Sequence, residues 1–166
     1  MRWTMPVDDQ MAMVGRLALA AFLGAFVGIE REIRGYPAGV RTIALVALGS
    51  ALFTEISTIT GSEDRIAAGI VSGIGFLGAG VIFREGYTVR GITTAATIWS
   101  AAAVGMAVGR ELYLAAGLGS LLIFILLEAR PVVRRLDGIL AARLGGFKAR
   151  EDAEEEDAAE GRGKDE

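Results

Sequence analysis

The sequence predicts an all-α integral membrane protein with five transmembrane helices, its N-terminus outside and its C-terminus in the cytosol. Three observations support this fold class: long apolar runs that contain almost no charge, glycine and alanine concentrated inside those runs, and arginines gathered in alternate loops. A helix needs about 17–25 largely apolar residues to cross the hydrocarbon core. Small residues are typical of the contact faces of packed membrane helices. Five such runs in succession are rare in soluble proteins, so we expect a membrane-spanning bundle.

The runs leave a short segment before them, residues 1–10, which we expect to be periplasmic. Arg16 lies inside the first run and Glu55 inside the second, and the last run ends at Glu128. The loops after the first, third and fifth runs hold eight arginines, against three on the other side, and arginine favours the cytoplasmic side. We expect a transmembrane domain over residues 11–129, with spans at about 11–29, 42–62, 66–83, 91–109 and 112–128.

The C-terminal part of the chain has a different composition. Residues 131–147 combine apolar residues at spacings of three and four with interspersed arginines, which predicts an amphipathic helix on the inner leaflet. Residues 148–166 form an acidic tail that we expect to be disordered, because it has little apolar surface to bury. From Glu151 onward the tail holds nine acidic and two basic residues, so the low pI of about 5.1 is a property of the tail.

The composition excludes several classes of function. Cysteine and histidine are absent, which removes disulfides, Ser-His and Cys-His catalysis and soft-metal sites. No nucleophile–base pair or phosphate-binding loop stands in an aqueous segment, so we do not expect an enzyme. We expect no nucleic-acid partner either. A bound metal would have to be a hard cation held by oxygen ligands.

A Gly-x-Gly-x-x-Gly pattern at Gly73, Gly75 and Gly78 suggests dinucleotide binding at first sight. That fingerprint requires a turn from a strand into a helix and an acidic residue about 20 positions later, where this chain has Ala95. The glycines lie inside an apolar span, so helix packing is the better interpretation. The packing glycines that we predict are Gly24, Gly28, Gly69, Gly73, Gly75, Gly78, Gly80, Gly105 and Gly109.

The first and third spans resemble each other. "FLGA" occurs at 22–25 and at 76–79, followed each time by Arg-Glu, by Gly-Tyr, and then by "GVRT" at 39–42 or "RGITT" at 90–94. The shared order favours a duplicated helix hairpin, and the two copies would be related by an axis along the membrane normal. Such a repeat either holds a functional site at its interface or only builds a stable bundle.

Arg16 and Glu55 need a physical reason to lie in apolar spans, because a charge at the bilayer centre costs roughly 2.5–3.5 kcal/mol. Both lie about 8–10 Å below the outer boundary, at 1.5 Å of rise per residue, on consecutive antiparallel helices. We therefore expect an intramembrane ion pair between them. The alternative is that Arg16 snorkels outward and Glu55 faces water.

The loop "GIEREIRGYPAGVRT" is a second polar concentration, at the cytosolic end of the first span. Glu30 and Arg41 could pair across it and close a cavity. Glu30 and Glu32 could instead hold hydrated Mg²⁺, which proteins usually bind through carboxylates and water; no other cofactor is expected. The third alternative is that the arginines only set topology and the acids are solvated.

On the fourth span, Thr93, Thr97 and Ser100 share one helix face. Their hydroxyls could form a polar track for an ion, although bonding to the helix backbone or across helices is the more common role. Trp99 lies near mid-span, deeper than an interfacial anchor, and we expect it to pack in the interior.

The motifs "GIEREIRGYPAGVRT", "VSGIGFLGAGVIF" and "GITTAATIWSAAAVG", in this order, resemble the MgtC/SapB family of bacterial membrane proteins over roughly residues 12–128. The resemblance implies an inner-membrane protein linked to growth in low magnesium, and it connects members with restraint of the F-type ATP synthase and control of membrane potential. The virulence-factor members carry a soluble ACT-like domain after the membrane part. This chain ends instead in a short helix and an acidic tail, and this shorter architecture resembles the SapB branch. The motif positions carried over are Glu30, Arg31, Arg41, Thr42, Gly91, Thr93, Thr94 and Trp99, with the glycines of the third span.

Two functional classes remain open. One is a regulator of another membrane complex that acts by helix–helix contact, supported by small-residue stripes such as Ala20-Gly24-Gly28 and Ala101-Gly105-Gly109. The other is a small transporter or channel for Mg²⁺ or another ion, supported by the repeat and the charged residues. In both cases we expect a multi-pass protein of the bacterial inner membrane, in contact with lipids and assembled as a homodimer.

Overall fold

The computed structural model describes residues 5–85 and 88–129. The chain divides into two compact units, Met1–Leu127 and Glu128–Glu166, and the account below concerns the first. The predicted amphipathic helix at 131–147 and the acidic tail at 148–166 lie outside the described residues. Their prediction is therefore untested.

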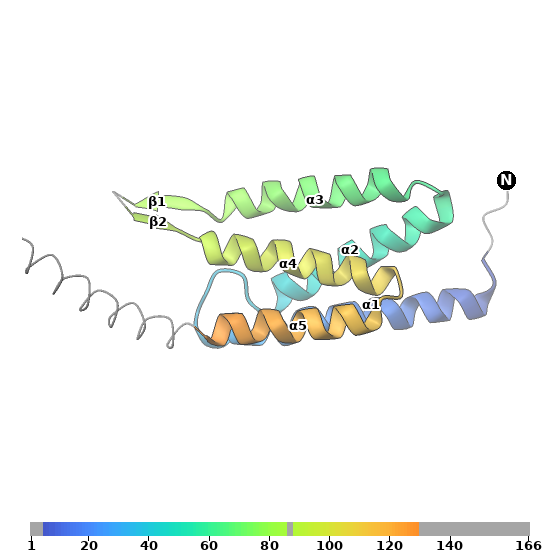
Figure 1. Ribbon diagram of the computed structural model, residues 1–166, viewed down its shortest axis with the longest axis horizontal. Coiled ribbons are helices and arrows are strands. Elements are labelled where there is room, and N and C mark those ends of the chain that lie inside the picture. Colours follow the sequence, from blue (N-terminus) through green and yellow to red (C-terminus); the bar gives the residue numbers. More distant parts are fainter. Residues whose placement is uncertain (1–4, 86–87, 130–166) are drawn as a thin grey trace, which may run out of the picture. The chain divides into compact units, whose positions relative to one another are not determined.

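The described residues form five helices and one short hairpin (Figure 1). Each helix falls on one of the predicted runs, and the first extends about one turn beyond its run at each end. The hairpin lies between the third and fourth helices. The elements are α1 Val7–Ile33, α2 Val40–Thr60, α3 Glu63–Gly80, β1 Phe83–Glu85, β2 Thr88–Arg90, α4 Ile92–Gly109 and α5 Tyr113–Glu128.

Three of the described helices, α1, α2 and α4, are long and apolar enough to cross a membrane. The helix α3 begins with Glu63, Asp64 and Arg65, which lowers the hydropathy of its 18 residues, and α5 has only 16 residues. The all-helical bundle is thus as predicted. The crossing of all five helices and the direction of the chain stay predictions.

The hairpin between α3 and α4 was not predicted from the sequence. Its strands are antiparallel, with Phe83 opposite Arg90, and each has only three residues. Such a short strand carries too little alternation to be distinguished from a loop. Gly91 follows the hairpin with a φ of 91°, and a Cβ there would lie 1.9 Å from the carbonyl oxygen of Val81. Only glycine therefore fits where the chain returns to start α4.

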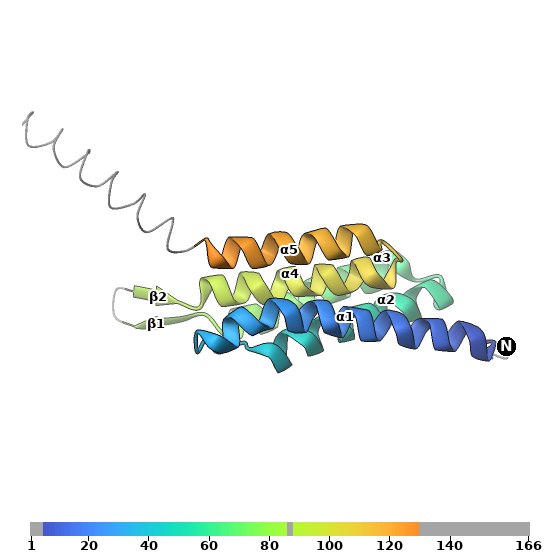
Figure 2. The ribbon, with the colours of Figure 1, turned by 90° about the horizontal axis from the view of Figure 1, so that it is seen from below.

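The helices α2 and α4 occupy the centre of the bundle (Figures 1 and 2). Each contacts α1, α3 and the other central helix. The helix α5 lies against α1 and α4, where Ala116 is buried and the Phe124 ring stacks on Phe26 at 4.8 Å between centroids. The core is built largely from small apolar residues, namely Ala20, Ala51, Val104, Val108 and Ala116 in one cluster and Val27, Ala38, Ile43, Ile98 and Ala101 in the other.

Glycines on α1 and α4 explain how closely these helices approach α2. A Cβ on Gly24 would lie 2.8 Å from the Ala47 Cβ, and one on Gly105 would lie 2.1 Å from the Ala47 carbonyl oxygen. Gly28 and Gly109 are equally confined, at 2.7 and 2.8 Å from backbone atoms of α2. A larger residue at these positions would push the helices apart, so these glycines pack as predicted for membrane bundles.

Candidate functional site

Charged side chains gather in two clusters, one near each end of the bundle, and each cluster contains buried and exposed members. We name them after the predicted orientation. The outer cluster consists of Arg16, Glu55 and Glu111. The inner cluster consists of Glu30, Arg31, Arg34, Tyr36 and Thr94.

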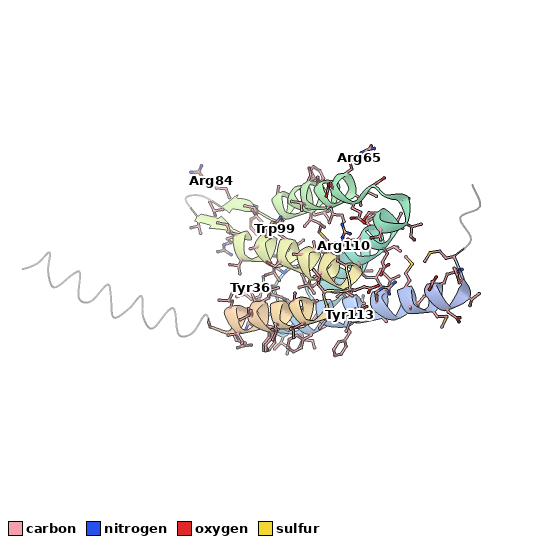
Figure 3. All side chains as sticks on the ribbon, turned by 45° about the vertical axis from the view of Figure 1, so that its right-hand side comes forward. Tyr36, Arg65, Arg84, Trp99, Arg110 and Tyr113 are labelled. Carbon is pink, nitrogen blue, oxygen red and sulfur yellow. The ribbon has the colours of Figure 1, made fainter. Side chains whose placement is uncertain are left out.

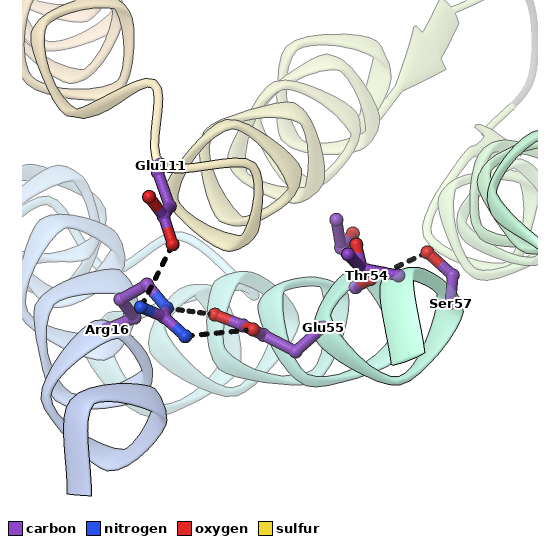
Figure 4. Close-up of polar contacts among 6 residues, drawn as sticks. Arg16, Thr54, Glu55, Ser57 and Glu111 are labelled. Atoms are coloured by element: carbon purple, nitrogen blue, oxygen red, sulfur yellow. Dashed lines mark hydrogen bonds and ion pairs between the residues drawn. The ribbon is translucent and has the colours of Figure 1, made fainter. Parts of the chain in front are cut away.

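In the outer cluster, Arg16 of α1 forms a two-pronged ion pair with Glu55 of α2 (Figure 4). The Arg16 Nε atom donates to Glu55 Oε1, and Nη2 donates to Oε2 at 3.2 Å. The Glu55 side chain is 8% exposed. The structure thus places together the two residues that the sequence analysis paired. Two parallel hydrogen bonds neutralise both charges in a fixed geometry, which reduces the cost of burying them.

A third member of the outer cluster was missed by the sequence analysis. Glu111, in the turn between α4 and α5, accepts from Arg16 Nη1 at 3.1 Å. Among the described residues, Glu111 is the only non-glycine with a positive φ, at 61°. A side chain in this region of backbone space is uncommon and costs on the order of 1 kcal/mol or more. Neither its backbone conformation nor its ion pair has a local sequence signal.

The inner cluster joins the end of α1 to the start of α4. Arg31 is 2% exposed, and its Nη2 atom donates to Thr94 Oγ1 at 2.6 Å. Its guanidinium group also stacks over the Tyr36 ring, 3.7 Å from the centroid. Both partners belong to motif segments that the sequence analysis singled out. The contact between Arg31 and Thr94 joins residues that are 63 positions apart in the sequence, so it could not be inferred from spacing.

Glu30 is the second buried charge of the inner cluster. Its Oε1 atom accepts from Arg34 Nε at 2.7 Å, one helical turn later, and its side chain is 2% exposed. The Oε2 atom is buried and has no hydrogen-bond partner among the described residues. Burial without a partner is costly for a carboxylate oxygen. One of the two Glu30 carboxylate oxygens is therefore left unsatisfied by the described part of the bundle.

The other residues predicted at the inner end are exposed, whereas Glu30 is buried. Glu32 is exposed, and its Oε2 atom accepts the backbone N–H of Val40 at 3.0 Å, at the start of α2. A carboxylate there complements the positive end of the α2 dipole. Arg41 and Thr42 are exposed on the first turn of α2. The described residues contain no group of three acidic side chains that could hold a metal. The predicted Glu30–Glu32 site needs only two carboxylates and water, so it stays a prediction.

Of the hydroxyls in the predicted polar track, Thr97 bonds to its own helix, and hydroxyls on α2 that were outside the prediction do the same. Thr97 donates to the Thr93 carbonyl at 2.8 Å, and on α2 Thr54 donates to the Ser50 carbonyl at 2.8 Å. Ser57 donates to the Thr54 carbonyl at 2.6 Å, as Figure 4 shows. Hydroxyls that back-bond in this way are the usual solution in membrane helices. They are satisfied locally and need no ion.

The prediction that Trp99 packs in the interior is wrong. Its side chain is 52% exposed on α4 (Figure 3). Depth along a helix does not determine which face a residue occupies, and here the buried face carries Thr94, Ile98 and Ala101 instead. In a bilayer Trp99 would face lipid or another protein.

The α3 glycines form two groups. A Cβ on Gly78 would lie 3.5 Å from the Ala95 Cβ on α4, which is an ordinary van der Waals contact. A Cβ on Gly69, Gly73, Gly75 or Gly80 would meet no described atom within 4 Å. Within the chain, these four do not pack as the α1 and α4 glycines do.

A groove of about 780 Å³ runs between α2 and α3. Its walls come from α2 between Thr42 and Phe53 and from α3 between Arg65 and Leu77. Apolar side chains dominate them, and Arg65 is the one charged residue that lines the groove. None of the members of the outer or inner cluster lines it.

These features define a small helical membrane protein whose few charges are paired inside the bundle. The sequence profile of the MgtC family matches residues 17–136, which cover the whole helical part that the structure describes apart from its first turns. The chain therefore belongs to the MgtC family.

Three relatives illustrate the similarity. An uncharacterized protein, slr0014, of Synechocystis sp. is 51% identical over 113 residues, 66% of this chain and 48% of the relative. Protein MgtC of Brucella abortus is 46% identical over 136 residues, 80% of this chain and 57% of the relative. Protein MgtC of Salmonella typhimurium is 51% identical over 108 residues, 62% of this chain and 47% of the relative. The chain spans about half the length of these relatives, and no solved structure matches it.

Proposed function

We propose that the protein regulates another membrane complex during adaptation to low magnesium, and that it acts through helix contacts along the outward face of α3. Membership of the MgtC family supports the link with magnesium homeostasis. The same resemblance makes the F-type ATP synthase a candidate complex and the bacterial inner membrane the expected location. The proposal assigns no catalytic reaction to the chain.

The observation that carries the proposal is the composition of the outward face of α3. Ala68, Ser72, Gly75 and Ala79 recur at spacings of four and three, so they form one stripe, and all four are exposed. The exposed face of α5 differs, since it is covered by bulky side chains such as Leu114, Leu118 and Leu122. Bulky apolar residues are what a lipid-facing helix can use freely, whereas small residues allow a second helix to approach closely.

The energetics of glycine support the same interpretation. Glycine inside a helix is less favourable than alanine by roughly 1 kcal/mol. Gly75 has no atom near its missing Cβ, so the fold of the chain gains nothing from that cost. A close contact outside the chain, with another complex or with a second copy in a homodimer, would offset it.

Growth of a deletion strain in magnesium-limited medium tests the proposal. We expect Gly75→Leu to lose the growth that the wild-type chain restores, because leucine would hold a partner helix away from α3. Gly117→Leu is the matched control, since Gly117 lies on α5 and also has nothing within 4 Å of its missing Cβ. Equal growth of both variants, at equal amounts in the membrane, would contradict the proposal.

Transport of Mg²⁺ or another ion is the second candidate, and the buried Glu30 Oε2 atom, which has no hydrogen-bond partner among the described residues, favours it. We propose to test it as flux into proteoliposomes that contain a Mg²⁺-sensitive dye under an imposed potential. Uptake that Glu30→Gln abolishes would support transport. Absence of flux, where a known Mg²⁺ channel conducts, would remove the Mg²⁺ pathway and leave regulation.

The contacts between helices also support the proposed duplication of a hairpin. If α1–α2 and α3–α4 are two copies, α1 corresponds to α3 and α2 to α4. A two-fold relation then requires that α1 contact α4 as α3 contacts α2, and both contacts occur, with α2 and α4 at the centre. In this proposal the α2–α3 groove corresponds to the side of α1 and α4 on which α5 lies.

A further inference from the structure

We propose that the groove between α2 and α3 binds one phospholipid, with an acyl chain along the groove and the headgroup phosphate on Arg65. This site is distinct from the outward face of α3, and it is independent of the proposed regulation.

The charge at one end of the groove fits a phosphate. Arg65 is exposed on the first turn of α3 and extends outward from it (Figure 3). Arg16, Arg34 and Arg110 each pair with a carboxylate, whereas no carboxylate among the described residues pairs with Arg65. A guanidinium group binds phosphate through two parallel hydrogen bonds, so Arg65 is suited to an anionic headgroup.

The position of Arg65 agrees with this assignment. It immediately precedes the uncharged run that starts at Ile66, so it lies where the apolar part of the helix begins. In a bilayer this is the level of the headgroups, where a basic side chain can reach a lipid phosphate.

The walls of the groove fit an acyl chain. Beyond Arg65 the lining is mostly apolar, with Ile66 and Ile70 on α3 and Leu45 and Phe53 on α2, and only Thr42 and Ser50 add hydroxyls. Its volume of about 780 Å³ is in the range of small-molecule sites, which are mostly apolar with a few polar groups.

The length of the groove distinguishes a lipid from a helix as its occupant. From Arg65 to Leu77 the groove extends for about 18 Å, at 1.5 Å of rise per residue. One leaflet of the hydrocarbon core is about 15 Å deep, half of the roughly 30 Å that a transmembrane helix must cross. The groove is therefore as long as an acyl chain in one leaflet and too short for a spanning helix.

Glycine keeps the groove open. Gly73 lines it, and nothing within 4 Å would meet a Cβ there. A leucine at this position would fill the groove without a clash inside the chain. Gly75 lies on the same helix, has equal free space, and does not line the groove. Gly73→Leu and Gly75→Leu are therefore a matched pair of variants.

Native mass spectrometry of the purified full chain with added phosphatidylglycerol tests the proposal. We expect the wild-type chain to retain one phosphatidylglycerol more tightly than any later adduct. Gly73→Leu and Arg65→Gln should weaken this first adduct at least tenfold, while Gly75→Leu should keep it. Photoreactive phosphatidylglycerol with a diazirine in its acyl chain should label residues 42–53 and 65–77 in the wild type.

Two results would overturn the proposal. The first is a first adduct of equal strength in Gly73→Leu and the wild type, or a series of adducts without a tighter first one. The second is a lipid-free dimer of the wild-type chain that is absent in Gly73→Leu. That result would show that a second copy of the chain, and not a lipid, covers the groove. Because this experiment reads lipid on the isolated chain, its failure leaves the growth test of Gly75→Leu unaffected.

Discussion

At the scale of single residues, the Arg16–Glu55 pair shows how two apolar helices can carry buried charges. Each partner removes the cost that the other would impose alone, and Glu111 adds a further acceptor from the α4–α5 turn. Removal of one partner lowers the stability of the bundle mainly because the other charge stays buried without a partner, which is strongly destabilising.

A double-mutant cycle measures this coupling. Arg16→Ala should lower the free energy of unfolding by about 2 kcal/mol more in the wild type than in a Glu55→Gln background, because the buried Glu55 charge is already gone in the latter. Unfolding by SDS in mixed micelles gives both values. Equal losses in the two backgrounds would show that the residues do not interact.

The inner cluster allows a matched comparison of two buried threonines. Thr94 and Thr97 are each 3% exposed on α4, but Thr94 accepts from Arg31 across the bundle while Thr97 donates to its own helix. Thr94→Val should cost about 1–3 kcal/mol, because it leaves a buried Arg31 N–H without its acceptor. Thr97→Val should cost much less, since its acceptor carbonyl keeps the helical hydrogen bond. The same SDS titration compares them, and similar losses would contradict the role given to Thr94.

At the scale of helices, the glycines separate into those that the bundle needs and those that it does not. Gly105→Ala should destabilise the bundle by about 1–3 kcal/mol, because its Cβ would lie 2.1 Å from the Ala47 carbonyl oxygen and force α4 away from α2. Gly69→Ala on α3 should instead stabilise the isolated chain by about 0.5–1 kcal/mol, because it has open space and a better helix former. Thermal unfolding in detergent distinguishes the two, and a loss at Gly69 would refute the distinction.

The sequence predicts the helices better than their faces. Runs of uncharged residues locate all five, because hydropathy needs only local composition. The same runs are apolar on every side, so they do not indicate which residues point inward. Trp99 was misplaced for this reason, and Gly24 and Gly75 look alike in sequence although only Gly24 touches a neighbouring helix.

At the scale of the whole molecule, the arrangement of the helices decides what the charged residues can do. The sequence suggested the Arg16–Glu55 pair because both residues had a predictable depth on adjacent helices. It could not suggest the Arg31–Thr94 contact, since that contact depends on how α1 and α4 rotate about their axes. The result is a bundle whose buried charges are mostly paired internally. Its distinctive surface is the exposed stripe of small residues on α3.

The most direct test of the account is cross-linking along α3 in native membranes. The chain has no cysteine, so a single Ser72→Cys on the outward face of α3 reports on that face alone, and Leu118→Cys on α5 is the control. With benzophenone maleimide, which alkylates the cysteine and on illumination inserts into a C–H bond of whatever lies against it, we expect a discrete higher-mass product for Ser72→Cys in cells grown with little magnesium, and little or none for Leu118→Cys. No product at Ser72, or equal products at both positions, would contradict the claim that this protein works through contacts on α3.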